Sequence, residues 1–102
     1  MVYDLLWKCD AEEDFANLDK GVRKQVIIQF KKLISSPELG KTLGKKAGFD
    51  LTGYLKLYFC QKKYRIVYKL DEKNKKVIIF AIGNREGMEV YREMVRRLEK
   101  TH

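Results

Sequence analysis

The stretch Thr52–Leu70, TGYLKLYFCQKKYRIVYKL, decides the fold. Its two halves, Thr52–Phe59 and Tyr64–Leu70, are rich in the aromatic and aliphatic residues that favour strands. Only Cys60–Lys63 separates them, and a link of that length has no room for a helix. The sequence therefore predicts an antiparallel hairpin.

The alternation of side chains sets the register of this hairpin. A loop of Cys60–Lys63 pairs Phe59 with Tyr64 and Tyr58 with Arg65, and a slip of one residue would mix apolar and charged side chains on both faces. Burial of one face should therefore fix this register. The predicted core face holds Leu55, Leu57, Phe59, Tyr64, Ile66 and Tyr68, and the opposite face holds Tyr54, Lys56, Tyr58, Arg65 and Lys69.

Further strands flank the hairpin. Residues 2–8 suit a first strand, and Val77–Ile82 suits a last one after the charged turn Asp71–Lys75. The last strand extends the hairpin into a three-stranded antiparallel meander. The glycine- and lysine-rich stretch 37–53 lacks the spacing of a phosphate-binding loop, and we interpret it as a connection.

Helices fill the remaining segments. Asp10 and Glu13 have the spacing of a capping box for a short helix, and Asp19 should cap a longer helix that ends at Ser35, before Pro37. These two helices should form an antiparallel hairpin. The apolar stripe of the longer helix is Val22, Val26, Phe30 and Leu33, widened by Ile27, Ile28 and Ile34.

A final helix is predicted over about residues 87–100 from the apolar residues Met88, Tyr91, Met94, Val95 and Leu98. The expected order is β-α-α-β-β-β-α, an α+β fold. Its sheet is an antiparallel three-stranded meander plus the N-terminal strand. Residues 1–102 are expected to form a single domain.

The composition limits the chemistry. His102 is the single histidine, and Cys9 and Cys60 are the two cysteines, so neither a zinc cluster nor a Ser-His-Asp triad is expected. We interpret the cysteines as small apolar residues rather than a disulfide. No cofactor and no metal are expected, and catalysis would have to use Lys, Arg, Tyr and carboxylates. No apolar run is long enough to cross a membrane, so a cytoplasmic location is expected.

The charge points to nucleic acid. The chain carries 22 basic and 14 acidic residues, a net charge of +8, and thirteen of the basic residues but only six of the acidic ones follow residue 50. Cations hold phosphates and aromatic rings stack on unpaired bases, so a sheet face of both kinds suits single-stranded RNA. The candidate RNA-binding residues are Tyr54, Tyr58, Lys62, Lys63 and Lys69.

The segments Gly53–Leu57, GYLKL, and Tyr64–Tyr68, YRIVY, resemble the central strands of the RelE/ParE toxin superfamily. Ile82–Glu86, IGNRE, with Tyr91 six residues after Arg85, is similar to the last strand and final helix of the RelE branch. The resemblance covers essentially the whole chain. It implies a toxin of a type II toxin–antitoxin system that cleaves mRNA in the ribosomal A site without a metal and is neutralised by a cognate antitoxin.

By matching positions, the resemblance implies catalytic roles for Lys56, Arg65, Arg85 and Tyr91. Arg65 would bind the scissile phosphate, and Lys56 would assist the attacking 2′-hydroxyl or steady the developing charge. Arg85 would stabilise or protonate the leaving 5′-oxygen, and Tyr91 would stack on or orient the attacked nucleotide.

The sequence departs from the RelE pattern at Tyr58, where a second strand lysine is expected. Two alternatives to the nuclease stay open, one from the ParE branch of the superfamily and one from Tyr58. One is a ParE-like inhibitor of DNA gyrase that acts by binding and not by catalysis. The other is a catalytically weakened toxin homologue that only binds its antitoxin.

Overall fold

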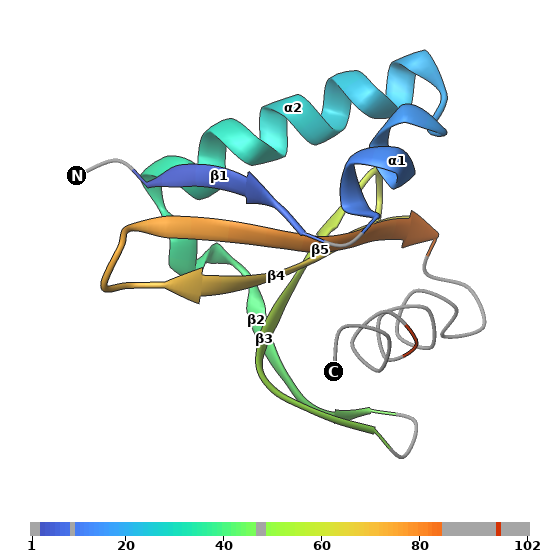
Figure 1. Ribbon diagram of the computed structural model, residues 1–102. Coiled ribbons are helices and arrows are strands. Elements are labelled where there is room, and N and C mark those ends of the chain that lie inside the picture. The colour runs from blue at the N-terminus through green and yellow to red at the C-terminus, as the bar shows by residue number, and fades with distance from the viewer. Residues whose placement is uncertain (1–2, 9, 47–48, 85–95, 97–102) are drawn as a thin grey trace.

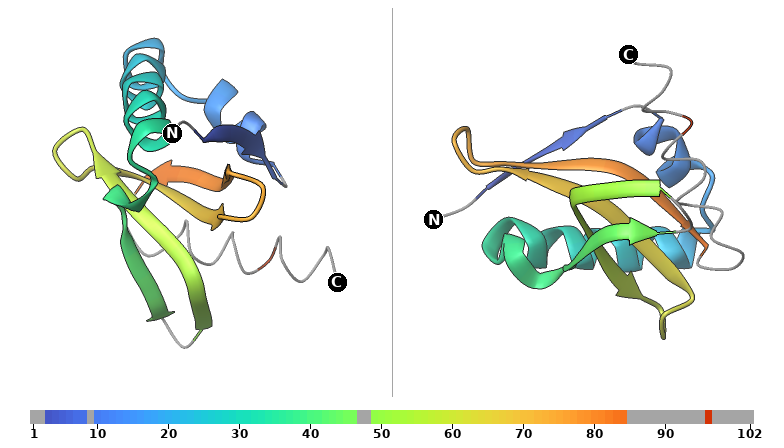
Figure 2. Two further views of the ribbon diagram at one scale, coloured as in Figure 1. Left: turned by 90° about the vertical axis from the view of Figure 1, so that its left-hand side faces the viewer. Right: turned by 90° about the horizontal axis from the view of Figure 1, so that it is seen from below.

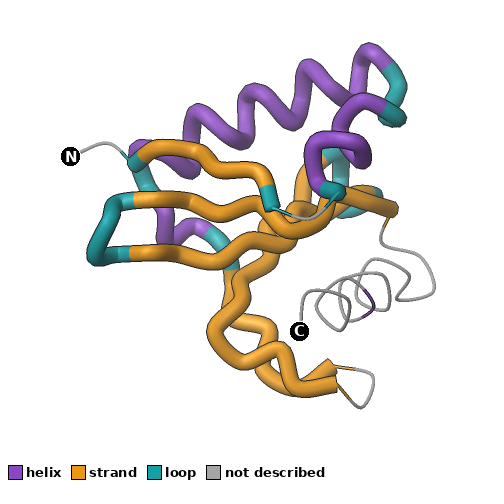
Figure 3. The backbone as a smooth tube through the Cα atoms, viewed as in Figure 1, coloured by secondary structure: helices purple, strands orange, loops and turns teal. Residues whose placement is uncertain are grey.

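The computed structural model describes residues 3–8, 10–46, 49–84 and 96. The strands form one sheet in the order β1-β5-β4-β3-β2, and the α+β class predicted from the sequence is confirmed (Figures 1 and 3). The predicted final helix lies outside the described residues, except Arg96, which is helical. The elements are β1 (Asp4–Trp7), α1 (Ala11–Ala16), α2 (Lys20–Ser35), the 3-10 helix η1 (Pro37–Leu39), β2 (Lys41–Lys46), β3 (Phe49–Phe59), β4 (Tyr64–Asp71) and β5 (Lys76–Asn84).

The sheet has one parallel pair and three antiparallel pairs. β1 runs parallel to β5 at one edge, because the chain crosses over through α1 and α2 before it returns to the sheet. β2, β3, β4 and β5 follow one another as an antiparallel meander. Both helices lie on the same side of the sheet (Figures 1 and 2).

The interpretation of residues 37–53 as a connection was wrong. Lys41–Lys46 forms β2, and β3 begins at Phe49 rather than Thr52. Glycines weaken the strand signal here, because Gly44 of β2 (φ +63°) and Gly53 of β3 (φ +94°) take left-handed conformations that a regular strand does not use. Pairing with β3 stabilises β2, although the residues of β2 have little intrinsic preference for a strand.

The core under the helices follows the predicted stripe of α2. Val26 and Leu33 are fully buried and Phe30 is 4% exposed, in one cluster with Ile66 and Tyr68 of β4. Ile27 and Ile28 do not widen the stripe, since they are 42% and 44% exposed. Each successive residue of a helix turns by about 100°, which carries these two side chains away from the sheet.

The predicted caps form only in part. Asp10 and Asp19 occupy the N-cap positions of α1 and α2, but neither makes a side-chain capping hydrogen bond. Within α1 it is Asp14 that reaches the sheet, where its carboxylate accepts a 3.1 Å hydrogen bond from the backbone N–H of Ile82. The helix stop before Pro37 is confirmed, because α2 ends at Ser35.

A buried tyrosine holds the junction between η1 and β2. The hydroxyl of Tyr68 donates a hydrogen bond to the carbonyl of Pro37 and accepts one from the N–H of Gly40, both at 2.8 Å. Burial raises the pKa of Tyr68 and Glu38 raises it further, while the hydrogen bond from Gly40 opposes them. The start of β2 is therefore fixed to the middle of β4.

The turn predicted at Asp71–Lys75 is confirmed, and a side chain closes it. The carboxylate of Asp71 accepts hydrogen bonds from the backbone N–H of Asn74 at 3.1 Å and from its side-chain amide at 2.9 Å. These two bonds lower the pKa of Asp71. Where β5 begins beside β1, Lys76 forms an ion pair with Asp4 at 3.2 Å.

Candidate nucleic-acid interface

The predicted hairpin register is confirmed residue by residue. Tyr58 lies opposite Arg65, Lys56 opposite Val67, and Tyr54 opposite Lys69. The apolar set packs against the core under the helices. The cations and tyrosines consequently share the sheet face that α1 and α2 do not cover.

That face also has an apolar patch. Leu43, Leu51, Val67, Phe80 and Ala81 form a second buried cluster, with Tyr54 and Ile78 packed against it. The sequence predicted only a mixture of cations and aromatic rings here. This buried cluster gives the neighbouring cations surroundings of low polarity, in which interactions with an anion are stronger than in open water.

Arg65 is the most enclosed cation of this face. It lies in β4 and is 3% exposed, and its guanidinium carbon is 5.2 Å from the centre of the Tyr58 ring. Its pairing partner in β5 is Gly83, which has no side chain to occupy the space beside Arg65. A guanidinium on an aromatic ring in such a place is oriented before any ligand binds.

Lys56 uses the same ring. Its Nζ lies 5.1 Å from the centre of the Tyr58 ring, and the side chain is half-buried. One tyrosine thus holds two cations, one from β3 and one from β4. Two neighbouring positive charges repel each other, and a bound phosphate relieves that repulsion while it gains charge-assisted hydrogen bonds.

A second cation–tyrosine pair continues along the face. The Nζ of Lys69 is 5.3 Å from the centre of the Tyr54 ring. Tyr54 in turn meets Phe80 edge-to-face, with 5.1 Å between the ring centres. Five of the predicted site residues thus share this face: Tyr54, Lys56 and Tyr58 of β3, and Arg65 and Lys69 of β4.

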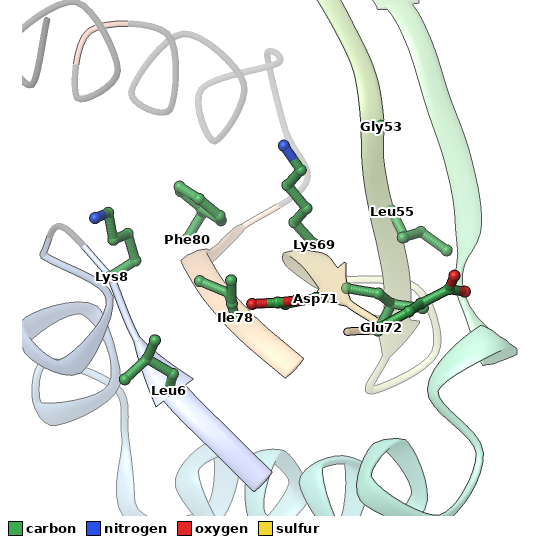
Figure 4. A pocket seen from close by; sticks show the side chains of 10 residues that line it. Leu6, Lys8, Gly53, Leu55, Lys69, Asp71, Glu72, Ile78 and Phe80 are labelled. Atoms are coloured by element: carbon green, nitrogen blue, oxygen red, sulfur yellow. The ribbon is translucent and has the colours of Figure 1, made fainter. Parts of the chain in front are cut away.

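Beside Lys69 the face is hollowed, with a volume of about 690 Å³ (Figure 4). Figure 4 shows Lys8 and Lys69 on either side of Phe80 in this view. Asp71, which Figure 4 shows below Lys69, and Glu72 also line it, so side chains of both charges surround the hollow.

The structure places the loop lysines apart from this group. Lys62 and Lys63 are exposed, and Lys63 lines a shallow pocket with Val22 and Gln25 of α2, on the helix side of the sheet. Three successive loop residues, Cys60, Gln61 and Lys62, have positive φ angles of 53°, 56° and 68°. Arg85 and Tyr91 lie outside the described residues.

Lys41 is not among the site residues predicted from the sequence. It lies directly opposite Lys56 in the pairing of β2 with β3, and it is exposed. The signal was present as a lysine two residues before Leu43, which belongs to the second cluster. It was hidden because residues 37–53 were interpreted as a connection.

Other kinds of site find little support in the described part of the chain. No group of three or more His, Cys, Asp or Glu side chains is placed there to hold a metal ion. Cys60 is a free, half-buried thiol. No helix within the described ranges is long and apolar enough to cross a membrane.

Known structures share this fold. A mutant E. coli RelE toxin in the free state superimposes with a TM-score of 0.75 and 27% sequence identity, covering 96% of this chain and 99% of that one. The isolated E. coli RelE toxin superimposes with a TM-score of 0.68 and 26% sequence identity, covering 94% of this chain and 98% of that one. The RelBE2 toxin–antitoxin complex of Mycobacterium tuberculosis has a chain that superimposes with a TM-score of 0.68 and 22% sequence identity, covering 83% of this chain and 100% of that one. This is a likeness of fold alone.

Sequence comparison leads to the same family. No curated protein matches this chain at the required significance. The family model described as the ParE toxin of type II toxin–antitoxin system, parDE, matches residues 5–88, which is most of the chain. The chain therefore belongs to the RelE/ParE family of toxins of type II toxin–antitoxin systems.

Proposed function

We propose that this toxin is a metal-independent, ribosome-dependent endoribonuclease that cleaves mRNA and so inhibits translation. The observation that carries the proposal is the group formed by Lys56, Tyr58 and Arg65, in which two cations lie 5.1 and 5.2 Å from the centre of one ring. A protein that only binds another protein has no need to gather two positive charges on one tyrosine ring.

The proposed reaction is an attack of a ribose 2′-oxygen on the adjacent phosphorus. The bond from phosphorus to the 5′-oxygen of the next nucleotide breaks, leaving a 2′,3′-cyclic phosphate and a free 5′-hydroxyl. Arg65 binds the scissile phosphate and stabilises its added charge in the transition state, since its planar fork suits phosphate oxygens. Because Arg65 is buried against Tyr58, little reorganisation accompanies the reaction.

The remaining roles follow from the resemblance. Lys56 assists removal of the proton from the 2′-hydroxyl or steadies the charge that develops there. Arg85 stabilises or protonates the leaving 5′-oxygen, and Tyr91 stacks on or orients the attacked nucleotide. Tyr54, Lys69 and the ring of Tyr58 guide the single strand along the sheet face opposite α1 and α2.

The proposed partners are mRNA in the ribosomal A site and a cognate antitoxin protein. Solved relatives include a RelE mutant in complex with an antitoxin peptide, with 26% identity and a TM-score of 0.70. The chain's net charge of +8 favours an acidic antitoxin segment, because opposite charges accelerate association.

Primer extension on ribosome-bound mRNA tests the proposal. The wild-type protein should introduce cleavages, and Arg65→Ala and Arg85→Ala should abolish them. Lys73→Ala is a matched control, because it removes one positive charge from the exposed turn after β4 and should cleave like the wild type. Intact mRNA with folded wild-type protein would contradict the proposal.

Inhibition of DNA gyrase is the second candidate, and the match to the ParE family model favours it. A DNA supercoiling assay run beside the primer extension separates the two. Inhibited supercoiling with intact mRNA would identify a gyrase inhibitor, whereas cleaved mRNA with unaffected supercoiling would identify the nuclease.

A weakened toxin that only binds its antitoxin is the third candidate, and Tyr58 is the residue that suggests it. If the missing lysine limits catalysis, Tyr58→Lys should increase toxicity in cells. Unchanged toxicity in a stably folded Tyr58→Lys protein would remove the argument for this candidate.

A further inference from the structure

Lys41 and Lys56 are direct partners across β2 and β3. Residues paired in this way share one face of the sheet, with their β-carbons about 4.5–5.5 Å apart. Two like charges at such positions destabilise a sheet. Within the described ranges neither Lys41 nor Lys56 is paired with a carboxylate, and the ion pair of Lys76 with Asp4 lies elsewhere, between β5 and β1.

We infer that Lys41 is a further substrate-binding residue that contacts a phosphate of single-stranded RNA beside Lys56. The inference rests on the proposed function and adds a residue to its site. Lys41 and Lys56 form one row across the sheet, and Tyr58 and Arg65 form the next row, two residues along β3. At about 3.3 Å per residue, the two rows are roughly 7 Å apart, so the three cations form one compact group.

The position of Lys41 is built into the fold. The preceding residue, Gly40, donates its N–H to the buried hydroxyl of Tyr68 at 2.8 Å. A β-carbon on residue 40 would lie 2.7 Å from the carbonyl oxygen of Lys56, so the two backbones touch here. The first residue of β2 is thereby fixed against β3, although β2 is an edge strand with no neighbour on its other side among the described strands.

A lysine on an edge strand has another explanation, because it discourages pairing with a second chain. That role accounts for a charge on β2, but it would be served by a lysine anywhere on the strand. The location opposite Lys56 is the one that adds like-charge repulsion inside the site. A phosphate between the two lysines removes that repulsion, which explains the position as well as the charge.

Binding of a short 2′-O-methyl single-stranded RNA, which cannot be cleaved, tests the inference. Affinity is measured by fluorescence anisotropy across a series of salt concentrations. Because the Lys41→Ala protein lacks one phosphate contact, it should bind the RNA about five- to tenfold more weakly than the wild type at low salt. The slope of log K against log salt should become less steep by about 0.7. Lys41→Arg should keep the wild-type slope.

Lys73→Ala is again the matched control. It also removes one charge, but from the turn after Asp71. The four steps along β4 from Val67 to Asp71 alone span roughly 13 Å, more than the Debye length of about 10 Å in 0.1 M salt. Its slope should therefore equal that of the wild type. Because Lys41 is exposed, Lys41→Ala should fold, and relief of repulsion should leave its unfolding midpoint equal or higher.

The outcomes separate this inference from the proposed function. Equal slopes for Lys41→Ala and Lys73→Ala, or no RNA binding by the wild type, would overturn the role of Lys41. Increased aggregation of Lys41→Ala with unchanged RNA affinity would assign it to edge protection instead. Intact ribosome-bound mRNA would overturn the nuclease, while a reduced binding slope would still support a phosphate contact at Lys41.

Discussion

The backbone N–H of Gly40 donates a 2.8 Å hydrogen bond to the hydroxyl of Tyr68, a residue 28 positions later in the chain. This bond fastens the start of β2 to the central strand β4, and it leaves no room for a side chain at residue 40. A β-carbon there would lie 2.5 Å from the Tyr68 hydroxyl and 2.7 Å from the carbonyl oxygen of Lys56. The geometry of the candidate site therefore depends on a glycine that lies outside it.

Gly40→Ala should destabilise the protein by about 1–3 kcal/mol, because the Lys56 carbonyl is backbone and cannot turn away. Gly21→Ala is the matched control. It lies in α2, where an added β-carbon would have nothing within 4 Å, and it should stabilise the protein by about 0.5–1 kcal/mol. Urea denaturation measures both, and equal effects of the two substitutions would contradict this account.

Tyr68→Phe should cost about 1–3 kcal/mol at neutral pH, because it leaves the Pro37 carbonyl and the Gly40 N–H without their partner. The loss should also be visible as a lower urea midpoint. A near-neutral effect would mean that water replaces the hydroxyl.

The same variant tests the raised pKa of Tyr68. Above about pH 10, the unfolded chain loses the phenolic proton while the folded protein keeps it. Wild-type stability should therefore fall as the pH rises from about 10 towards the folded pKa, by up to about 1.4 kcal/mol per pH unit from this group. Tyr68→Phe should lack this component, so its stability deficit should shrink between pH 8 and pH 11. A constant deficit would show that burial does not shift the pKa.

Arg65→Lys should reduce cleavage of ribosome-bound mRNA by about 100-fold or more, although it keeps the charge. A lysine cannot offer the planar pair of donors or the same stacking on Tyr58. Cleavage rates are compared by primer extension, with circular dichroism to show that the variant is folded. Full activity of Arg65→Lys would mean that a positive charge alone is sufficient at this position.

Tyr58→Ala should lower cleavage by about tenfold, because two cation–π contacts of about 0.5–1 kcal/mol each are lost and Lys56 and Arg65 become less ordered. Tyr58→Phe keeps the ring and serves as the control, with activity close to that of the wild type. If Tyr58→Phe lowered the cleavage rate as much as Tyr58→Ala, the hydroxyl and not the ring would be the important group.

Gln61→Gly should stabilise the hairpin loop. Gln61 has a φ of +56° between two other residues with positive φ, and a left-handed conformation costs a residue with a side chain about 1–2 kcal/mol. The greater freedom of glycine in the unfolded chain offsets part of this, so a gain of about 0.5–1 kcal/mol in unfolding free energy is expected. A loss of stability would show that the Gln61 side chain is held by contacts that outweigh the strain.

The hairpin register was predictable because alternation is a local property with one strong constraint. Only one pairing of Thr52–Phe59 with Tyr64–Leu70 gathers the aromatic and aliphatic set from Leu55 to Tyr68 on one face, so Tyr58 had to lie opposite Arg65. The stripe of α2 followed for the same reason, whereas Ile27 and Ile28 were misassigned because hydrophobicity alone does not state which side of a helix is covered.

The sequence by itself determined the α+β class, the hairpin and the face that carries Lys56 and Arg65. These depend on apolar residues that recur every two positions in strands and every three to four positions in helices. Only the tertiary structure decided that Lys41 joins them. Its strand is too rich in glycine and lysine to be recognised locally, and it exists because β3 pairs with it and Tyr68 fastens its first residues. Contacts between residues far apart in the chain leave no periodic signal, and they complete the candidate site.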